Sequence, residues 1–394
     1  MEGSGEPAPK RVKHEETIFK TFDKCLRSQL DKVRKSLRDG MNLRFLKIRC
    51  ANANASVSFS KATCDTESHV WPESSGIALT GKKVKCVIGS IFVEGLDMME
   101  KYFKRGKIPE DPDYQKALEK LLTFLSKSRE DNEALFEDMK DKSEGDWAIR
   151  VAQHLLVQLS VYDSYLIDSY KGCNFSCCPC PRKDHLLGFT CDTSFGCENS
   201  WHGKPDIIVQ DIPVTVQMEG MPALRPEPSA ETAVSSKKDN KFLQQHKAQL
   251  KAQTITFSPL QEKTNKCKLR NSLVPGIGIS TKYLLVNFYD SVHDVLLTSK
   301  PLTIFKGEEL MYSTILFLWL TLNYRLLCSG LTETMKPFKA GFFDVVDIST
   351  FRENVRRPLH VSHEDDDDDD DDPTDNPGLS FNPPPSLLSK YIDP

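Results

Sequence analysis

The chain of 394 residues is long enough for one large domain or two ordinary ones, and its 39% hydrophobic and 27% charged residues are typical of a globular protein. A mean hydropathy of −0.42 indicates that polar segments are attached to the folded part. The net charge of −4 is unevenly spread, because residues 363–394 carry −10 and residues 1–50 carry +6. A basic N-terminal segment of this kind is typical of proteins that bind a nucleic acid or an import receptor.

Export and membrane insertion are not expected from the apolar segments. Residues 1–20 lack the apolar stretch of a signal peptide. The longest apolar run, at 315–322, is far shorter than the roughly 20 residues that span a bilayer. We therefore expect a soluble intracellular protein without a membrane segment, in which the cysteines are reduced. In that setting clustered cysteines more often bind metal or lie buried than form disulfides.

Residues 1–14 are expected to be a disordered leader with a nuclear import signal. The stretch PAPKRVKHEE, from Pro7 to Glu16, resembles the Myc-type signal, in which a Lys-Arg-x-Lys core follows prolines. The resemblance implies binding to a nuclear import receptor and a nuclear location. The alternative is a chance basic patch, because short basic runs are frequent.

Residues 15–145 are expected to form a helical and β N-terminal region. Apolar residues at spacings of three and four predict an amphipathic helix from Glu15 to Arg38. Its basic outer face is interpreted as a solvated surface rather than a phosphate contact. Residues 43–94 alternate like short strands, and helical spacing returns at 113–140.

From residue 146 to 298 the pattern reads helix, three strands, helix, hairpin. A helix is predicted at 146–168 and a strand near 186–190; two more strands, at 206–209 and 214–218, are separated by a short turn that indicates a hairpin. A flexible insertion at 220–240 precedes a helix at 241–262.

The C-terminal part is expected to be ordered up to residue 358. Strands at 283–288 and 292–297 form a hairpin with His293 and Asp294 in its turn, and a buried helix follows at 308–327. Residues 359–394, with their aspartate run and prolines, cannot bury enough apolar surface to fold alone and are expected to be a disordered acidic tail.

The stretch WHGKPDIIV, from Trp201 to Val209, followed by VTVQM, from Val214 to Met218, places Pro-Asp at the entry of an apolar strand and polar residues on the next strand. This arrangement resembles the PD-(D/E)xK nuclease superfamily, especially its λ-exonuclease-like branch, over about 150 residues. The resemblance implies an α/β fold with a restriction-endonuclease-like core over residues 146–358, in which helices flank a central mixed sheet.

The resemblance also implies a site for Mg²⁺ or Mn²⁺, since such nucleases use a divalent ion to polarise the phosphoryl group and activate water. Asp206 corresponds to the first carboxylate ligand, Gln217 stands where the second acid is expected, and Glu219 stands where the lysine is expected. Because side chains alternate along a strand, Gln217 and Glu219 share one face, and Glu219 could supply the second carboxylate. The missing lysine could be replaced by another; the candidates are Lys204, Lys241 and Lys247.

Helices on both sides of the strands offer further candidates. Members of this branch carry a glutamine on the helix after the third strand, and here Gln249 and Gln253 share one helix face; a plain exposed glutamine is the alternative. On the first core helix the family has an acid or amide. The residues that could supply it are Glu144, Gln153 and His154.

The segment 172–202 is rich in cysteine and polar residues and lacks an apolar period, which favours a structural zinc site over packing. The spacings match no strong zinc-finger pattern, so the ligands stay open, with buried inert thiols as the alternative. The candidate ligands are Cys173, Cys177, Cys178, Cys180, Cys191, Cys197 and His202, with His185 nearby in the segment.

Together these features predict a nuclear, metal-dependent nuclease-like protein that acts on DNA, with a motif degenerate enough to leave catalysis uncertain. The alternatives are a non-catalytic nucleic-acid or chromatin-associated protein stabilised by zinc, and a scaffold whose tails recruit protein partners. Cleavage that needs metal and Asp206, salt-sensitive binding without cleavage, or neither would distinguish the three. The oligomeric state does not follow from the sequence.

Overall fold

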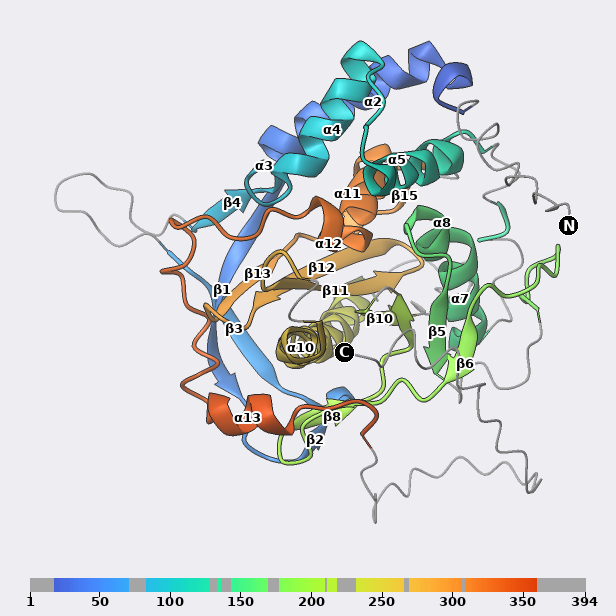
Figure 1. Cartoon of the computed structure of the whole chain (residues 1–394). Helices are drawn as coiled ribbons and strands as arrows, with labels where there is room; N and C mark the ends of the chain where they lie inside the picture. The colour runs from blue at the N-terminus through green and yellow to red at the C-terminus, as the bar shows by residue number, and fades with distance from the viewer. Residues whose placement is uncertain are drawn as a thin grey trace, which may run out of the picture.

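The described part of the chain is a strongly curved sheet that wraps around one long helix, α10 (Thr232–Asn265) (Figure 1). The computed structural model describes residues 18–70, 83–127, 133–135, 143–168, 177–209, 211–217, 232–265, 269–306 and 309–359, with backbone alone for 217 and 232–245. The expected leader, most of the expected insertion and all of the expected acidic tail after Leu359 lie outside these residues; Leu359 itself is buried.

The helices and strands fall as follows. The other helices are α2 (Lys24–Gly40), α3 (Ile88–Ile91), α4 (Val93–Arg105), α5 (Pro112–Leu125), α7 (Glu144–Val151), the π-helical turn η2 (Ala152–Leu156), α8 (Val157–Leu159), α11 (Tyr312–Leu322), α12 (Tyr324–Leu327) and α13 (Ile348–Asn354), with a 3-10 turn η1 (Phe59–Lys61). The strands are β1 (Asn42–Ala51), β2 (Val57–Ser58), β3 (Cys64–Ser68), β4 (Lys85–Val87), β5 (Tyr165–Asp168), β6 (Phe189–Cys191), β7 (Phe195–Gly196), β8 (Trp201–Gly203), β9 (Ile207–Val209), β10 (Ile212–Gln217), β11 (Leu273–Ser280), β12 (Tyr283–Asp290), β13 (Val295–Thr298), β14 (Leu302–Thr303), β15 (Phe305–Lys306) and β16 (Glu309–Leu310).

The main sheet has the strand order β3-β1-β13-β12-β11-β10-β9-β5-β6. The pairs β10–β11 and β5–β6 are parallel and the other pairs along this path are antiparallel. The prediction of an α/β fold with a mixed sheet is therefore confirmed. Arg44 of β1 lies opposite Thr298 of β13, so the N-terminal region contributes strands to the same sheet as the later part of the chain.

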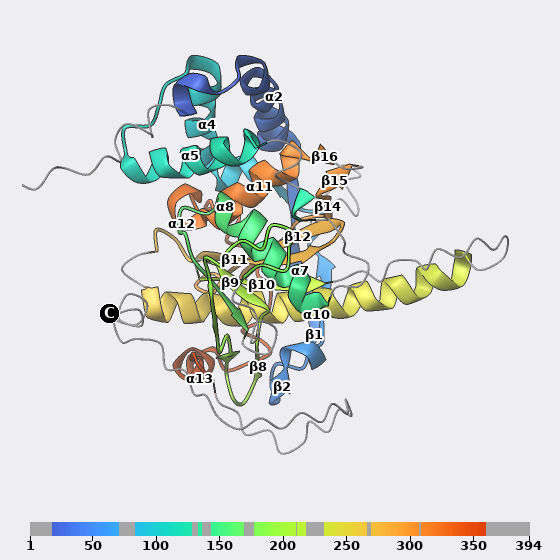
Figure 2. The same ribbon diagram turned by 90° about the vertical axis from the view of Figure 1, so that its right-hand side faces the viewer.

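Helix α10 packs directly on β11 because two glycines of that strand leave room for it. A Cβ atom at Gly278 would lie 2.9 Å from Cδ2 of Leu250, and one at Gly276 would collide with the Thr254 side chain. Figure 2 shows α10 crossing the whole molecule, with its N-terminal part extending beyond the other elements. The sheet and this helix thus form two layers that pack against each other.

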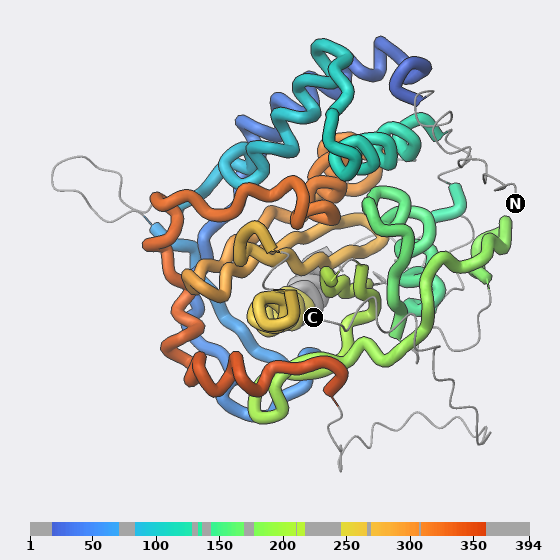
Figure 3. The backbone as a smooth tube through the Cα atoms, in the orientation of Figure 1, coloured from blue at the N-terminus to red at the C-terminus, as the bar shows by residue number. Residues whose placement is uncertain are grey.

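The opposite face of the sheet is covered by helices from both ends of the chain. Helix α11 is apolar on all sides and buried, as expected of a helix inside the core. The ring of Phe288 on β12 lies 6.4 Å from that of Phe317 on α11 and 5.9 Å from that of Phe92. In the tube view, α2, α4, α5 and α11 lie together above the sheet (Figure 3).

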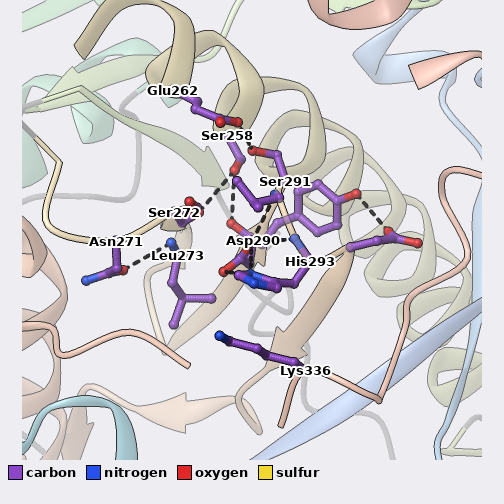
Figure 4. A network of polar contacts seen from close by, with 12 residues as sticks. Ser258, Glu262, Asn271, Ser272, Leu273, Asp290, Ser291, His293 and Lys336 are labelled. Carbon is purple, nitrogen blue, oxygen red and sulfur yellow. Dashed lines mark hydrogen bonds and ion pairs between the residues drawn. The ribbon is translucent and has the colours of Figure 1, made fainter. Parts of the chain in front are cut away.

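The hairpin between β12 and β13 closes as the sequence predicts. The Asp290 carboxylate accepts hydrogen bonds from the backbone N–H groups of Val292 at 3.0 Å and His293 at 2.8 Å (Figure 4). Residues 291–294 form the turn. Beside it, buried Tyr289 donates its hydroxyl to Asp294 Oδ1 at 2.8 Å.

Four expected boundaries are wrong. The helix predicted at 146–168 ends at Leu159, and residues 165–168 form β5 because they pair with β9. Residues 232–240, expected within a flexible insertion, belong to α10, because they contain neither proline nor glycine and extend the following helix. Residues 88–91 and 93–94, expected to be strand-like, belong to α3 and α4; Ile88, Ile91 and the intervening Phe92 are all buried at helical spacing. The predicted helix at 308–327 begins with β16 and breaks at Asn323.

Candidate functional site

The carboxylate of Asp206 lies where β9 and β10 diverge. β9 pairs with β10 in the predicted hairpin, with Ile207 opposite Val214. Asp206 directly precedes β9 and is 8% exposed, and its Oδ2 accepts a hydrogen bond from the backbone N–H of Val216 at 2.6 Å. The side chain therefore bridges the two strands instead of continuing the backbone ladder.

A second carboxylate, on β5, lies beside Asp206. Asp168 ends β5, and its backbone N–H donates to the Asp206 carbonyl at 3.1 Å. Since Ile167 pairs with Ile207, Asp168 and Asp206 are cross-strand neighbours whose side chains share one face. Asp168 is 5% exposed. Sequence reasoning missed it, because a lone aspartate at the end of a short strand gives no pattern.

A lysine in the segment between β8 and β9 reaches the carboxylate of Asp168. Lys204 Nζ lies 3.8 Å from Oδ1 of Asp168 and 3.8 Å from Oδ1 of Asp192. Lys204 was one of the three candidates for the missing lysine of the motif. Of the other two, Lys241 has only its backbone described, and Lys247 belongs to a separate cavity beside β3.

Helix α10 contributes a buried glutamine on the same face of the sheet. Thr215 of β10 donates its hydroxyl to Oε1 of Gln253, which is fully buried, and Nε2 of Gln253 has no hydrogen-bond partner among the described residues. Gln249, one turn earlier, is half-buried and affects the pKa of His246 on the same helix. The two glutamines thus have different roles: Gln253 lies against β10, and Gln249 contacts its own helix.

The remaining motif positions are only partly visible. Gln217 ends β10 directly after Val216, whose N–H binds Asp206, but the Gln217 side chain and all of Glu219 lie outside the described residues.

On the first core helix, Glu144 lies near His246 of α10. Burial lowers the pKa of His246, and the negative charge of Glu144 opposes part of that lowering. The side chain of Gln153, by contrast, makes hydrogen bonds that hold the structure together. Its Oε1 accepts from the Tyr165 hydroxyl at 2.8 Å and from Leu187 N–H at 3.0 Å, and its Nε2 donates to the His185 carbonyl at 2.8 Å. These contacts fix the cysteine-rich loop to the helix.

A second candidate site joins this helix to the cysteine segment. His154, in η2, meets Cys178 and Cys180, and their ligand atoms all lie within 4.8 Å of one another, so the group could hold a metal ion. His154 Nε2 is 3.3 Å from Cys178 Sγ, and its Nδ1 is 3.8 Å from Asp184 Oδ2. A carboxylate behind the imidazole is the usual orienting partner of a metal-bound histidine.

Burial sets the protonation of these three side chains. It lowers the pKa of His154 to about 4, which keeps the imidazole neutral as metal ligation requires. It also raises the pKa of the Cys178 thiol to about 12, against the lowering effect of a backbone hydrogen bond at Cys180. A bound cation would offset that effect of burial, since a coordinating thiol is deprotonated by the metal.

The other predicted zinc ligands do not join this group. Cys177 lies in a bridge with His185, and Cys191 ends β6. Cys197 and His202 belong to the β7–β8 hairpin, where His202 Nδ1 is 3.0 Å from the Ser200 carbonyl. These side chains follow separate strands, so nearness in sequence does not bring them together. Cys173 lies outside the described residues.

Within the described ranges, the His154 group is the one cluster of three or more such side chains close enough to share an ion; the carboxylates of Asp168, Asp192 and Asp206 do not meet that distance. The described helices include none with the length and apolar character needed to cross a bilayer. No family model, curated protein or solved structure matches the chain.

Proposed function

We propose that the protein is a nuclear, metal-dependent nuclease-like protein that acts on DNA. The observation that carries the proposal is the pairing of Asp168 and Asp206 on one face of the sheet, with Lys204 Nζ 3.8 Å from Asp168 Oδ1. Two carboxylates and a lysine are the groups that the PD-(D/E)xK motif supplies, and here they come from β5, the entry of β9 and the segment before it.

The donor set fits a hard divalent cation. Asp168 and Asp206 offer carboxylate oxygens, which Mg²⁺ and Mn²⁺ prefer over nitrogen and sulfur. When bound, such an ion polarises the phosphoryl oxygen and lowers the pKa of an attacking water. Lys204 would orient that water or hold the phosphate, and Asp192 on its other side keeps the ammonium group in place.

Helix α10 supports the site by fixing the strand that carries the motif. The Thr215–Gln253 hydrogen bond ties β10 to α10, and the Asp206–Val216 bond ties β9 to β10. The elements α7, β5, β9, β10, α10 and β11 follow one another along the chain, with β6 to β8 between β5 and β9 and with β10 parallel to β11, and this order supports the proposal.

We also propose that His154, Cys178 and Cys180 hold a structural Zn²⁺. Two thiols and an imidazole are its usual ligands, and structural zinc takes four; Cys173 is the remaining candidate for the fourth. The ion would fix the loop at 177–185, which leads into β6 beside β5 and Asp168.

The test is cleavage of end-labelled single- and double-stranded DNA with Mg²⁺ or Mn²⁺. We expect Asp206→Asn and Asp168→Asn each to reduce cleavage at least ~100-fold, since losing a metal-holding carboxylate costs several kcal/mol of transition-state stabilisation. Asp163→Asn is the matched control, because Asp163 is exposed before the other end of β5 and pairs with Lys116 and Lys120.

Cleavage unchanged in Asp206→Asn would contradict the proposal. Salt-sensitive DNA binding without cleavage by the wild-type protein would instead support the second candidate, a zinc-stabilised nucleic-acid-binding protein. The group of His154, Cys178 and Cys180, which could hold a metal ion, is the observation that favours this second candidate.

A further inference from the structure

A cavity of about 510 Å³ lies between α10 and the strands β1, β3, β12 and β13. It is separate from the acidic pair, because α10 faces β10 through Gln253 on one side and β3 through Lys251 on the other. Its size falls in the range of pockets that hold small ligands.

Three cations face this cavity. Arg44 comes from β1, and Lys247 and Lys251, one helical turn apart, come from α10. Lys251 Nζ donates to the Cys64 carbonyl at 3.0 Å and to Thr66 Oγ1 at 2.8 Å, which anchors α10 to β3. Asp65 is the one acidic residue in the lining, so positive charge exceeds negative charge there.

Asp65 offsets only part of the positive charge in this lining. Burial lowers the pKa of both lysines, and the charge of Arg44 lowers that of Lys247 further. Buried Nε of Arg44 has no hydrogen-bond partner among the described residues. Like charges held together at a partly buried surface destabilise one another unless an anion joins them.

The floor of the cavity carries a buried amide. Asn287 of β12 is 1% exposed, and neither Oδ1 nor Nδ2 has a hydrogen-bond partner among the described residues. The register places Asn287 opposite Thr298, and Thr298 opposite Arg44, so these side chains share one face. A buried side-chain amide without partners is costly, and a ligand that both donates and accepts would satisfy it.

We infer that this cavity binds a phosphate monoester of about nucleotide size, with the phosphate on Arg44, Lys247 and Lys251 and a donor–acceptor edge of the ligand on Asn287. The planar guanidinium and two ammonium groups suit a phosphate dianion. A side-chain amide can donate one hydrogen bond to the edge of a nucleobase and accept another from it. The site does not depend on the proposed nuclease activity.

The experiment is calorimetric titration of the full chain with deoxyadenosine monophosphate, deoxyadenosine and inorganic phosphate. We expect the monophosphate to bind at least ~10-fold more tightly than either fragment, and more weakly at high salt. Lys247→Gln should weaken it ~10-fold or more, since a charge-assisted hydrogen bond is lost. Lys101→Gln, at an exposed site on α4, is the matched control.

Asn287→Leu separates a binding role from a structural one. Removing an unpartnered buried amide should leave the melting temperature of the free protein unchanged or higher, while the increase in melting temperature on adding the monophosphate is lost. Retention of that increase in Asn287→Leu would overturn the inference. So would equal binding of deoxyadenosine and the monophosphate.

A further comparison identifies the source of the phosphate. A short oligonucleotide is titrated with and without a terminal phosphate, beside the free monophosphate. Binding of the free monophosphate that is lost in Lys247→Gln assigns the site to a small molecule. Binding of only the phosphorylated strand, also lost in Lys247→Gln, assigns the site to the end of a nucleic-acid strand. Binding of neither overturns the inference.

Discussion

Replacing Asp206 by alanine and by asparagine should affect stability very differently. The Asp206 Oδ2 accepts the backbone N–H of Val216 at 2.6 Å, and Val216 is 1% exposed. Alanine removes the acceptor and leaves a buried N–H without its partner, which costs about 1–3 kcal/mol. Asparagine keeps a side-chain oxygen that can accept the same bond. It also removes one of two neighbouring negative charges, a pair that is unfavourable across strands.

We therefore expect Asp206→Ala to lower the free energy of unfolding by about 2 kcal/mol, and Asp206→Asn to change it by less than about 1 kcal/mol in metal-free buffer. With an entropy of unfolding of ~2.1 cal/mol/K per residue over roughly 300 ordered residues, 2 kcal/mol corresponds to a melting temperature lower by about 3 °C. Asparagine is accordingly the variant to use for cleavage.

Thermal and urea unfolding with circular dichroism, after chelation of divalent ions, measure both values. Asp163→Ala is the exposed control and should stay within about 0.5 kcal/mol of wild type. Equal destabilisation by alanine and asparagine would refute the reasoning, because it would mean that the hydrogen bond to Val216 does not carry the effect.

Two further predictions concern other buried groups. Cys178→Ser should abolish zinc binding. At a free zinc concentration a thousandfold above the dissociation constant, it should lower the free energy of unfolding by about 4 kcal/mol. Metal analysis and melting curves with and without a chelator check this, with exposed Cys25→Ser as control; full zinc content in Cys178→Ser would contradict it. Burial raises the pKa of Asp294, so the folded state holds that proton more tightly, and the stability that Asp294 contributes should fall as the pH rises above about 3.9. The free energy of unfolding of wild type relative to Asp294→Asn, measured in urea, should decline over that range; a flat difference would count against this.

Local patterns in the sequence were sufficient for elements whose partners lie nearby along the chain. The β9–β10 hairpin, with Asp206 at its entry, follows from two apolar runs and a short turn. The turn at His293 and Asp294 follows from the same kind of signal. In these cases strand period and turn chemistry agree with the final fold.

The site residues contributed by distant segments could not be predicted this way. Asp168 matters only because β5 pairs with β9, and His154 matters only because the loop with Cys178 folds back onto η2. The sequence makes His154 a candidate for the acidic site, yet its imidazole lies against the thiols of Cys178 and Cys180. Neither pairing leaves a periodicity in the sequence, because each depends on long-range contacts.

The position of β1 inside the sheet affects how the chain can fold as it is synthesised. β1 pairs with β3 and β4 soon after all three emerge, but its partner β13 follows only later, with Arg44 opposite Thr298. At ~5–20 residues per second, a separation of roughly 250 residues keeps that edge of β1 waiting for about 12–50 s. An apolar strand edge left open so long is a target for wrong pairing. Until β13 arrives, that edge of β1 is therefore open to pairing with the wrong strand.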